Sequence, residues 1–250
     1  MAERSTSADS LRVAVMGCST GGEAYSISWV IGSARPDLKL SLHAVDISRQ
    51  AVAIGKRGKY SLLDAELATD IFERMTDAEM EEFFDRKGEV AAVKLWIRKG
   101  IKWHVGDVGD PEVVDVLGCQ DIVVANYFLC DMDAAMAERC LRNIARLVRP
   151  HGFLFVSGID LDIRTKFAVE LGFVPLRELL EEIHEGDPSL RSHWPFHYRG
   201  LEPLNKKRRD WRLRYAAAFQ LVPSGAIAAG SGRDCRDVHR VSASGVLVHQ

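Results

Sequence analysis

The residues best suited to chemistry form a glycine-rich stretch near the N-terminus, Gly17-Cys-Ser-Thr-Gly-Gly-Glu23. It follows a short apolar run, and glycines at a turn from strand to helix let the backbone bend sharply and approach a ligand. The spacing of Gly17 and Gly21 matches neither the GxGxxG fingerprint of dinucleotide sites nor the GxxxxGK[ST] phosphate loop. The stretch therefore favours a nucleoside without a pyrophosphate, with an ordinary tight turn as the alternative.

Acidic and polar residues end the segments that follow. Asp46 closes the second apolar run, where a carboxylate can hydrogen-bond both ribose hydroxyls of a nucleoside, although an Asp here could instead cap the next helix. Asp107-Val108 follows a third run, and Asn126-Tyr127 ends a fourth. An acid at the third position can accept a hydrogen bond from an adenine amino group. This order is the one that class I S-adenosylmethionine (SAM) methyltransferases use.

The elements that must position these residues alternate between strands and helices. The apolar patterns predict strands at 11–16, 38–45, 101–105, 120–125 and 153–157 and a helix at 22–33. A further helix, capped by Asp131 or Asp133, continues to Leu147 and is broken by Pro150-His-Gly152. A strand at 214–222 would close the sheet as an antiparallel hairpin. We expect an α/β fold with a doubly wound, Rossmann-like sheet, mostly parallel with an antiparallel last strand.

Composition sets limits on partners and location. The 250 residues are 47% hydrophobic, and 33 Lys and Arg against 35 Asp and Glu give a net charge of −2, which argues against nucleic-acid or membrane binding. The N-terminus lacks the apolar core of a signal peptide, and the five cysteines contain no CxxC pair. We therefore expect a cytoplasmic protein with reduced thiols and no metal. The expected divisions are a flexible N-terminus at 1–10, one domain at 11–222 that binds SAM, and a flexible tail at 223–250.

These motifs resemble the SAM-binding half of the CheR-type protein-glutamate methyltransferases. The glycine-rich stretch, continued to Ile27, is similar to that family's STGEEPYSIA loop, and Ala44-Val-Asp-Ile-Ser48 is similar to its TDID segment. The resemblance covers about residues 11–160, with Gly22, Ala24, Asp107 and Ala125 as departures from the family pattern. Ten residues precede the first expected strand, so we expect the family's N-terminal helical domain to be absent. That absence weighs against methylation of chemotaxis receptors.

The resemblance implies SAM as cofactor, and it implies which residues bind it. The backbone around Gly17 contacts the cofactor, Glu23 the methionyl amine, and Asp46 the ribose. The full set of expected cofactor-binding residues is Gly17, Cys18, Ser19, Thr20, Gly21, Glu23, Asp46, Ile47, Asp107, Val108, Asn126 and Tyr127.

The expected reaction is O-methylation of a carboxylate or hydroxyl on a small molecule, peptide or glycan. A carboxylate needs only positioning, whereas a hydroxyl needs a proton acceptor, for which Tyr127 and His197 are the catalytic candidates. The basic segment 199–214 is either solvated surface or a docking site for an anionic substrate. The second interpretation favours an acidic acceptor. The alternative function is a catalytically degenerate module that keeps the SAM-binding fold and regulates a partner protein.

Overall fold

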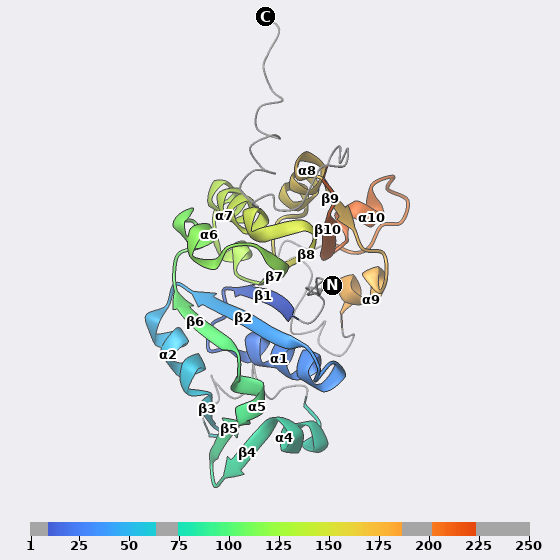
Figure 1. Cartoon of the computed structure of the whole chain (residues 1–250). Helices are drawn as coiled ribbons and strands as arrows, with labels where there is room; N and C mark the ends of the chain where they lie inside the picture. Colours follow the sequence, from blue (N-terminus) through green and yellow to red (C-terminus); the bar gives the residue numbers. More distant parts are fainter. Residues whose placement is uncertain (1–9, 64–74, 187–201, 224–250) are drawn as a thin grey trace, which may run out of the picture. The chain divides into compact units, whose positions relative to one another are not determined.

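The computed structural model describes residues 10–63, 75–186 and 202–223 (Figure 1). The chain divides into two compact units, residues 1–107 and 108–250. The predicted N-terminal and C-terminal flexible segments fall almost entirely outside the described residues, so those predictions stay as they are.

The first unit contains three parallel strands in the order β6-β2-β1: β1 (Ser10–Met16), β2 (Lys39–Asp46) and β6 (Ile101–Val105). Helix α1 (Gly22–Ala34) connects β1 to β2, and α2 (Arg49–Arg57) follows β2. Val13, Val15, Leu42 and Ala44 are fully buried, which explains the uninterrupted apolar runs that made these strands predictable.

The same unit carries a small antiparallel sheet that the sequence analysis did not predict. Its order is β3-β5-β4, built from β3 (Lys59–Ser61), β4 (Phe84–Lys87) and β5 (Val90–Val93). It is flanked by α4 (Asp77–Phe83), whose N-cap is Thr76, and by α5 (Leu95–Arg98). Phe83 and Phe84 are buried in one cluster with Tyr25 and Tyr60, so the apolar side chains of this region pack against protein.

The second unit continues the alternation of strands and helices. Its elements are α6 (Glu112–Leu117), β7 (Gln120–Asn126), η2 (Leu129–Asp131), α7 (Ala134–Leu147), β8 (Val148–Ser157), α8 (Leu161–Leu171), β9 (Phe173–Pro175), α9 (Leu180–Glu185), α10 (Trp211–Arg214) and β10 (Ala218–Leu221). The strand order is β7-β8-β10-β9; β7 and β8 are parallel, and β10 is antiparallel to both of its neighbours. The predicted α/β class, mostly parallel with an antiparallel last strand, is confirmed.

Two boundaries differ from the sequence-based expectation. Helix α7 ends at Leu147 and β8 begins at once, so Pro150-His-Gly152 lies inside this strand rather than before it. The strand accommodates the segment through a register irregularity opposite Gln120 and a left-handed His151 with φ 63°. The capping residue of α7 is Asp133, whose carboxylate accepts the Met136 N–H.

The last strand is shorter than expected, because Arg214 ends helix α10 and is 8% exposed. Its guanidinium forms ion pairs with Glu202 at 2.8 Å and with Asp162 at 2.5 Å. The Glu202 carboxylate also accepts a hydrogen bond from the Tyr215 hydroxyl at 2.6 Å. Arg214 therefore belongs to a structural ion-pair cluster, not to a solvated basic turn.

The described cysteines differ in their oxidation state. Cys18, Cys130 and Cys140 are free thiols, but Cys119 is disulfide-bonded, so the expectation of reduced thiols is wrong at that position. Pairing of cysteines distant in the sequence cannot be deduced from their spacing. Within the described ranges, none of the helices has the length and apolar character needed to cross a membrane.

Candidate functional site

The glycine loop, residues 17–21, links β1 to α1 through an unusual backbone path. Gly17, Ser19 and Gly21 all adopt left-handed conformations, with φ values of 68°, 47° and 100°. The Cys18 N–H donates to the Val45 carbonyl at 2.9 Å, which ties the loop to the end of β2. A left-handed serine is costly for a residue with a Cβ, and such conformations concentrate at ligand sites.

Asp46 is the residue that joins the parts of this site. Its Oδ2 accepts the Ser19 N–H at 2.7 Å and its Oδ1 accepts the Ser48 N–H at 2.8 Å. Its own carbonyl accepts the Gly106 N–H at 3.0 Å. An ionised carboxylate has about four acceptor positions, so these two bonds leave acceptor capacity for a ligand. The loop and the acid that the sequence singled out are therefore in direct contact.

The competing interpretation of Asp46 as a helix cap is wrong. The N-cap of α2 is Ser48, whose side chain accepts the Ala51 N–H at 3.2 Å. Asp46 instead orients Ser48 and the loop through its two oxygens. Ile47, between them, has a 71% exposed side chain.

Trp103, which the sequence analysis did not single out, explains why residue 21 is glycine. A Cβ added at Gly21 would lie 2.5 Å from the Trp103 ring, and one added at Gly55 in α2 would lie 2.4 Å from it. The indole therefore occupies the space next to both glycines. The structure accounts for Gly21 by this packing and by its φ of 100°, without a close approach of ligand to backbone.

Two buried tyrosines donate hydrogen bonds to backbone carbonyls in the loop and in the neighbouring helix α2. The Tyr60 hydroxyl donates to the Thr20 carbonyl at 2.7 Å, and the Tyr25 hydroxyl donates to the Gly55 carbonyl at 2.6 Å. Burial raises the pKa of Tyr25 to about 12 and raises that of Tyr60 further, so both remain donors at neutral pH. Tyr60 is thus a support of the loop.

The electrostatics of the loop are negative. Burial first, and the charges of Asp46 and Glu23 after it, raise the pKa of the Cys18 thiol to about 12. Cys18 is therefore a neutral packing residue and not a nucleophile. Glu23 lies in the first turn of α1, where the helix dipole favours a negative charge.

In the second unit, Asn126 and Tyr127 lie together at the end of β7. The Ser157 hydroxyl donates to the Asn126 side-chain oxygen at 2.7 Å, and the Tyr127 N–H donates to the Ser157 carbonyl at 3.0 Å. Tyr127 is left-handed, with φ 56°, and 48% exposed. A Cβ at Gly158 would lie 2.7 Å from the Tyr127 Cα and 2.8 Å from its ring Cδ1, so the backbone and one edge of the ring pack against Gly158.

The remaining predicted residues are placed differently from one another. Asp107 is exposed, whereas Val108 is 7% exposed and its carbonyl accepts the Asn143 side-chain N–H at 3.0 Å. Val108 therefore serves the core with its side chain. His197, the second catalytic candidate, lies outside the described residues. Sequence reasoning missed Asn143 and Ser157, which have no motif of their own and act through residues distant in the sequence.

A Rossmann-like α/β fold with a glycine loop hydrogen-bonded to an acid at the end of the second strand defines a nucleoside-binding class of protein. The chain belongs to the CheR methyltransferase family, since residues 1–161 match the model described as "CheR methyltransferase, SAM binding domain". SAM is the cofactor of this domain.

Two curated relatives carry the name "Probable biofilm formation methyltransferase WspC". The protein from Pseudomonas putida is 26% identical over 182 residues, which cover 71% of this chain and 40% of the relative. The protein from Pseudomonas aeruginosa is 22% identical over 185 residues, which cover 72% of this chain and 42% of the relative. The match thus spans about two fifths of the length of each relative.

Among solved structures, the chain is similar to magnesium protoporphyrin IX methyltransferase (ChlM) from Synechocystis PCC 6803 with bound SAM. The identity is 16%, the TM-score 0.41, and the match covers 68% of this chain and 63% of that one. The chain is also similar to the N-methyltransferase NodS from Bradyrhizobium japonicum, with 15% identity and a TM-score of 0.35. That match covers 63% of this chain and 57% of that one. TM-scores this low do not assign a fold, which is assigned above from strand order and direction.

Proposed function

We propose that this chain transfers the methyl group of SAM to an oxygen nucleophile, a carboxylate or a hydroxyl, of a small molecule, peptide or glycan. The observation that carries the proposal is Asp46, which holds the glycine loop through Ser19 and keeps acceptor capacity for the ribose of a nucleoside. Membership of the CheR methyltransferase family supports the activity, and the name of the WspC relatives agrees with it.

The residues around the loop suit a sulfonium nucleoside. The carboxylates of Asp46 and Glu23 provide a negative field for the sulfonium cation. Because SAM carries no phosphate, its binding requires neither a phosphate loop nor the lysine of such a loop. The exposed Ile47 offers an apolar contact beside the ribose position. When bound, SAM supplies an electrophilic methyl group. The protein must then hold the acceptor oxygen in line with the carbon–sulfur bond at about 3–3.5 Å and exclude water.

Tyr127 is our candidate for positioning the acceptor. Its backbone is fixed between Ser157 and Gly158, while the residue is about half exposed. A carboxylate acceptor is already an anion and needs no base, whereas a hydroxyl would have to lose its proton. We propose Tyr127, with His197, for that second case. A degenerate binding module would keep the same contacts between the loop and Asp46, so membership of the CheR methyltransferase family is what favours the active enzyme.

The proposal is tested by transfer of radiolabelled methyl groups from SAM to a fractionated cell extract. Methyl esters of carboxylates release labelled methanol in mild base, whereas methyl ethers keep the label. We expect label that depends on the protein, and none with the Asp46→Ala variant. Label found on nitrogen or carbon would contradict O-methylation, and absence of any transfer would contradict the activity.

A further inference from the structure

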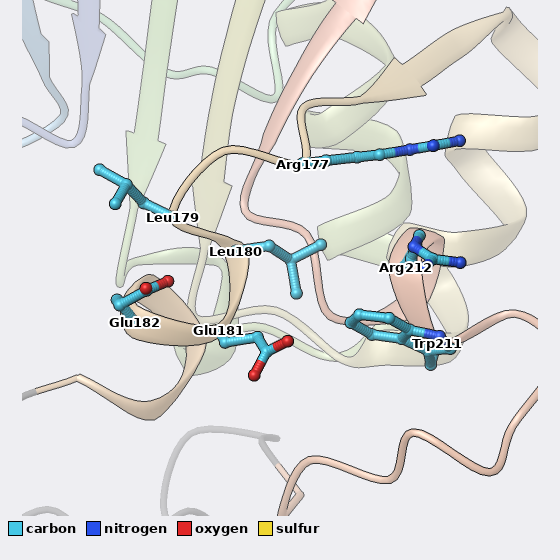
Figure 2. A pocket seen from close by; sticks show the side chains of 7 residues that line it. All are labelled: Arg177, Leu179, Leu180, Glu181, Glu182, Trp211 and Arg212. Carbon is cyan, nitrogen blue, oxygen red and sulfur yellow. The ribbon is translucent and has the colours of Figure 1, made fainter.

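A pocket of about 340 Å³ lies in the second unit, between α9 and α10 (Figure 2). Its walls come from the loop after β9, from α9 and from α10: Arg177, Leu179, Leu180, Glu181, Glu182, Trp211 and Arg212. This volume falls at the lower end of the range of about 300–1,000 Å³ for small-molecule sites. None of these residues belongs to the cofactor set described above.

The arginines of the pocket are not neutralised. Within the described part of the chain, neither Arg177 nor Arg212 has a carboxylate at ion-pair distance, whereas Arg208 pairs with Asp210 at 2.9 Å and Arg214 with Glu202. Figure 2 shows both arginine side chains extending to the same side of the pocket. Two guanidinium groups that reach one place from separate segments can hold an oxyanion with several charge-assisted hydrogen bonds.

The acidic residues of the pocket do not cancel this charge. Glu181 is paired with Lys206 at 2.5 Å, so its carboxylate is already compensated. The Glu182 side chain lies at the opposite end of the pocket, beside Leu179 (Figure 2). The arginine side of the pocket therefore carries two guanidinium groups, and the nearby Glu178 carboxylate accepts the Arg177 backbone N–H at 3.1 Å.

An apolar wall completes the site. Leu180 is 5% exposed and its side chain extends toward the Trp211 ring (Figure 2). The Arg212 guanidinium lies over that ring at 4.6 Å from its centroid, which restricts the arginine and lowers the entropy lost when it binds an anion. Leu179, at the rim, is left-handed with φ 54° and 65% exposed. The pocket thus pairs an oxyanion subsite with a surface for a flat or apolar group.

We infer that this pocket binds a small organic anion, a carboxylate or phosphate monoester joined to a flat or apolar group, with Arg177 and Arg212 holding the oxyanion and Trp211 and Leu180 contacting the body. The inference goes beyond the proposed methyl transfer and does not depend on it. It gives a specific role to Arg212 of the basic segment 199–214, in which Lys206, Arg208 and Arg214 are ion-paired.

The test is a calorimetric titration of the full chain with benzoate and with phenyl phosphate, and with benzamide as the uncharged control. We expect one or both anions to bind and benzamide not to bind. The anion that binds more tightly identifies the source of the oxyanion. Arg177→Gln and Arg212→Gln should each weaken binding about tenfold, equivalent to about 1.4 kcal/mol.

Arg209→Gln is the matched control, because it removes one positive charge from the same basic segment outside the pocket lining. We expect it to change the affinity by less than about twofold. Equal weakening by this control would show a general electrostatic field and overturn the inference. Equal binding of benzamide, or no binding of either anion at millimolar concentration, would also overturn it. Thermal unfolding of each variant shows that it is folded.

Discussion

Replacing Tyr60 by phenylalanine removes a single hydroxyl group that holds the glycine loop through the Thr20 carbonyl. The bond is 2.7 Å long and Tyr60 is 2% exposed, so the carbonyl loses its donor in a place with little access to water. Removal of one partner of a buried hydrogen bond costs about 1–3 kcal/mol. Tyr60→Phe should lower the free energy of unfolding by an amount in this range.

The loss of this hydrogen bond should also weaken cofactor binding. If the hydrogen bond from Tyr60 keeps the loop in its binding conformation, each kcal/mol lost lowers the population of that conformation and raises the dissociation constant for SAM by up to about fivefold. Tyr25→Phe is the matched control, because its hydroxyl donates at 2.6 Å to Gly55 in α2 and not to the loop. It should lose similar stability and change SAM affinity by less than about twofold.

Urea denaturation gives the stability of both variants, and calorimetric titration with SAM gives their affinities. The reasoning is refuted if Tyr60→Phe binds SAM as tightly as Tyr25→Phe while losing the same stability. That result would mean that the loop is held by its contacts with β2 alone.

Two further predictions concern stability. Gly21→Ala should destabilise the protein by at least about 1–3 kcal/mol, because the new methyl group meets Trp103 at 2.5 Å and φ is 100°; a urea midpoint equal to that of the wild type would contradict this. Hydrogen bonds from Arg214 and Tyr215 lower the pKa of Glu202 from 4.5 to about 2, so its stabilising contribution is complete above about pH 4.5 and is lost as the pH falls toward 2. Glu202→Gln should therefore be less stable than the wild type at neutral pH, and the difference should shrink over this range. A difference that stays constant with pH would rule out the ion pair as its cause.

The sequence was informative where local pattern and sheet geometry coincide. Uninterrupted apolar runs marked β1 and β2, and parallel strands place their carboxyl ends at one edge, so the contact between the glycine loop and Asp46 followed from their positions alone. The helix start at Asp133 followed from a capping residue placed before a helical pattern.

Other features depend on contacts between distant positions. Strand β4 has the sequence Phe-Asp-Arg-Lys, which lacks the alternation of a half-buried strand, and pairing with β5 after a left-handed Gly88 makes it a strand. Arginine is a residue type expected at the surface, yet Arg214 is buried because it pairs with Glu202 and Asp162, which lie 12 and 52 residues away in the sequence. The contact of Trp103 with Gly21 likewise joins the middle of β6 to the start of α1, which no local motif connects.

The central claim is that Asp46 binds the ribose of SAM while it holds the glycine loop, and calorimetric titration of Asp46→Asn with SAM tests it most directly. Asp37→Asn is the control: Asp37 is an exposed acid of the same unit, paired with Arg35, and it lies before the start of β2, whereas Asp46 lies at the end of that strand. We predict that Asp46→Asn weakens SAM binding at least about tenfold and that Asp37→Asn leaves it unchanged. Equal affinities for folded Asp46→Asn and the wild type would contradict the claim.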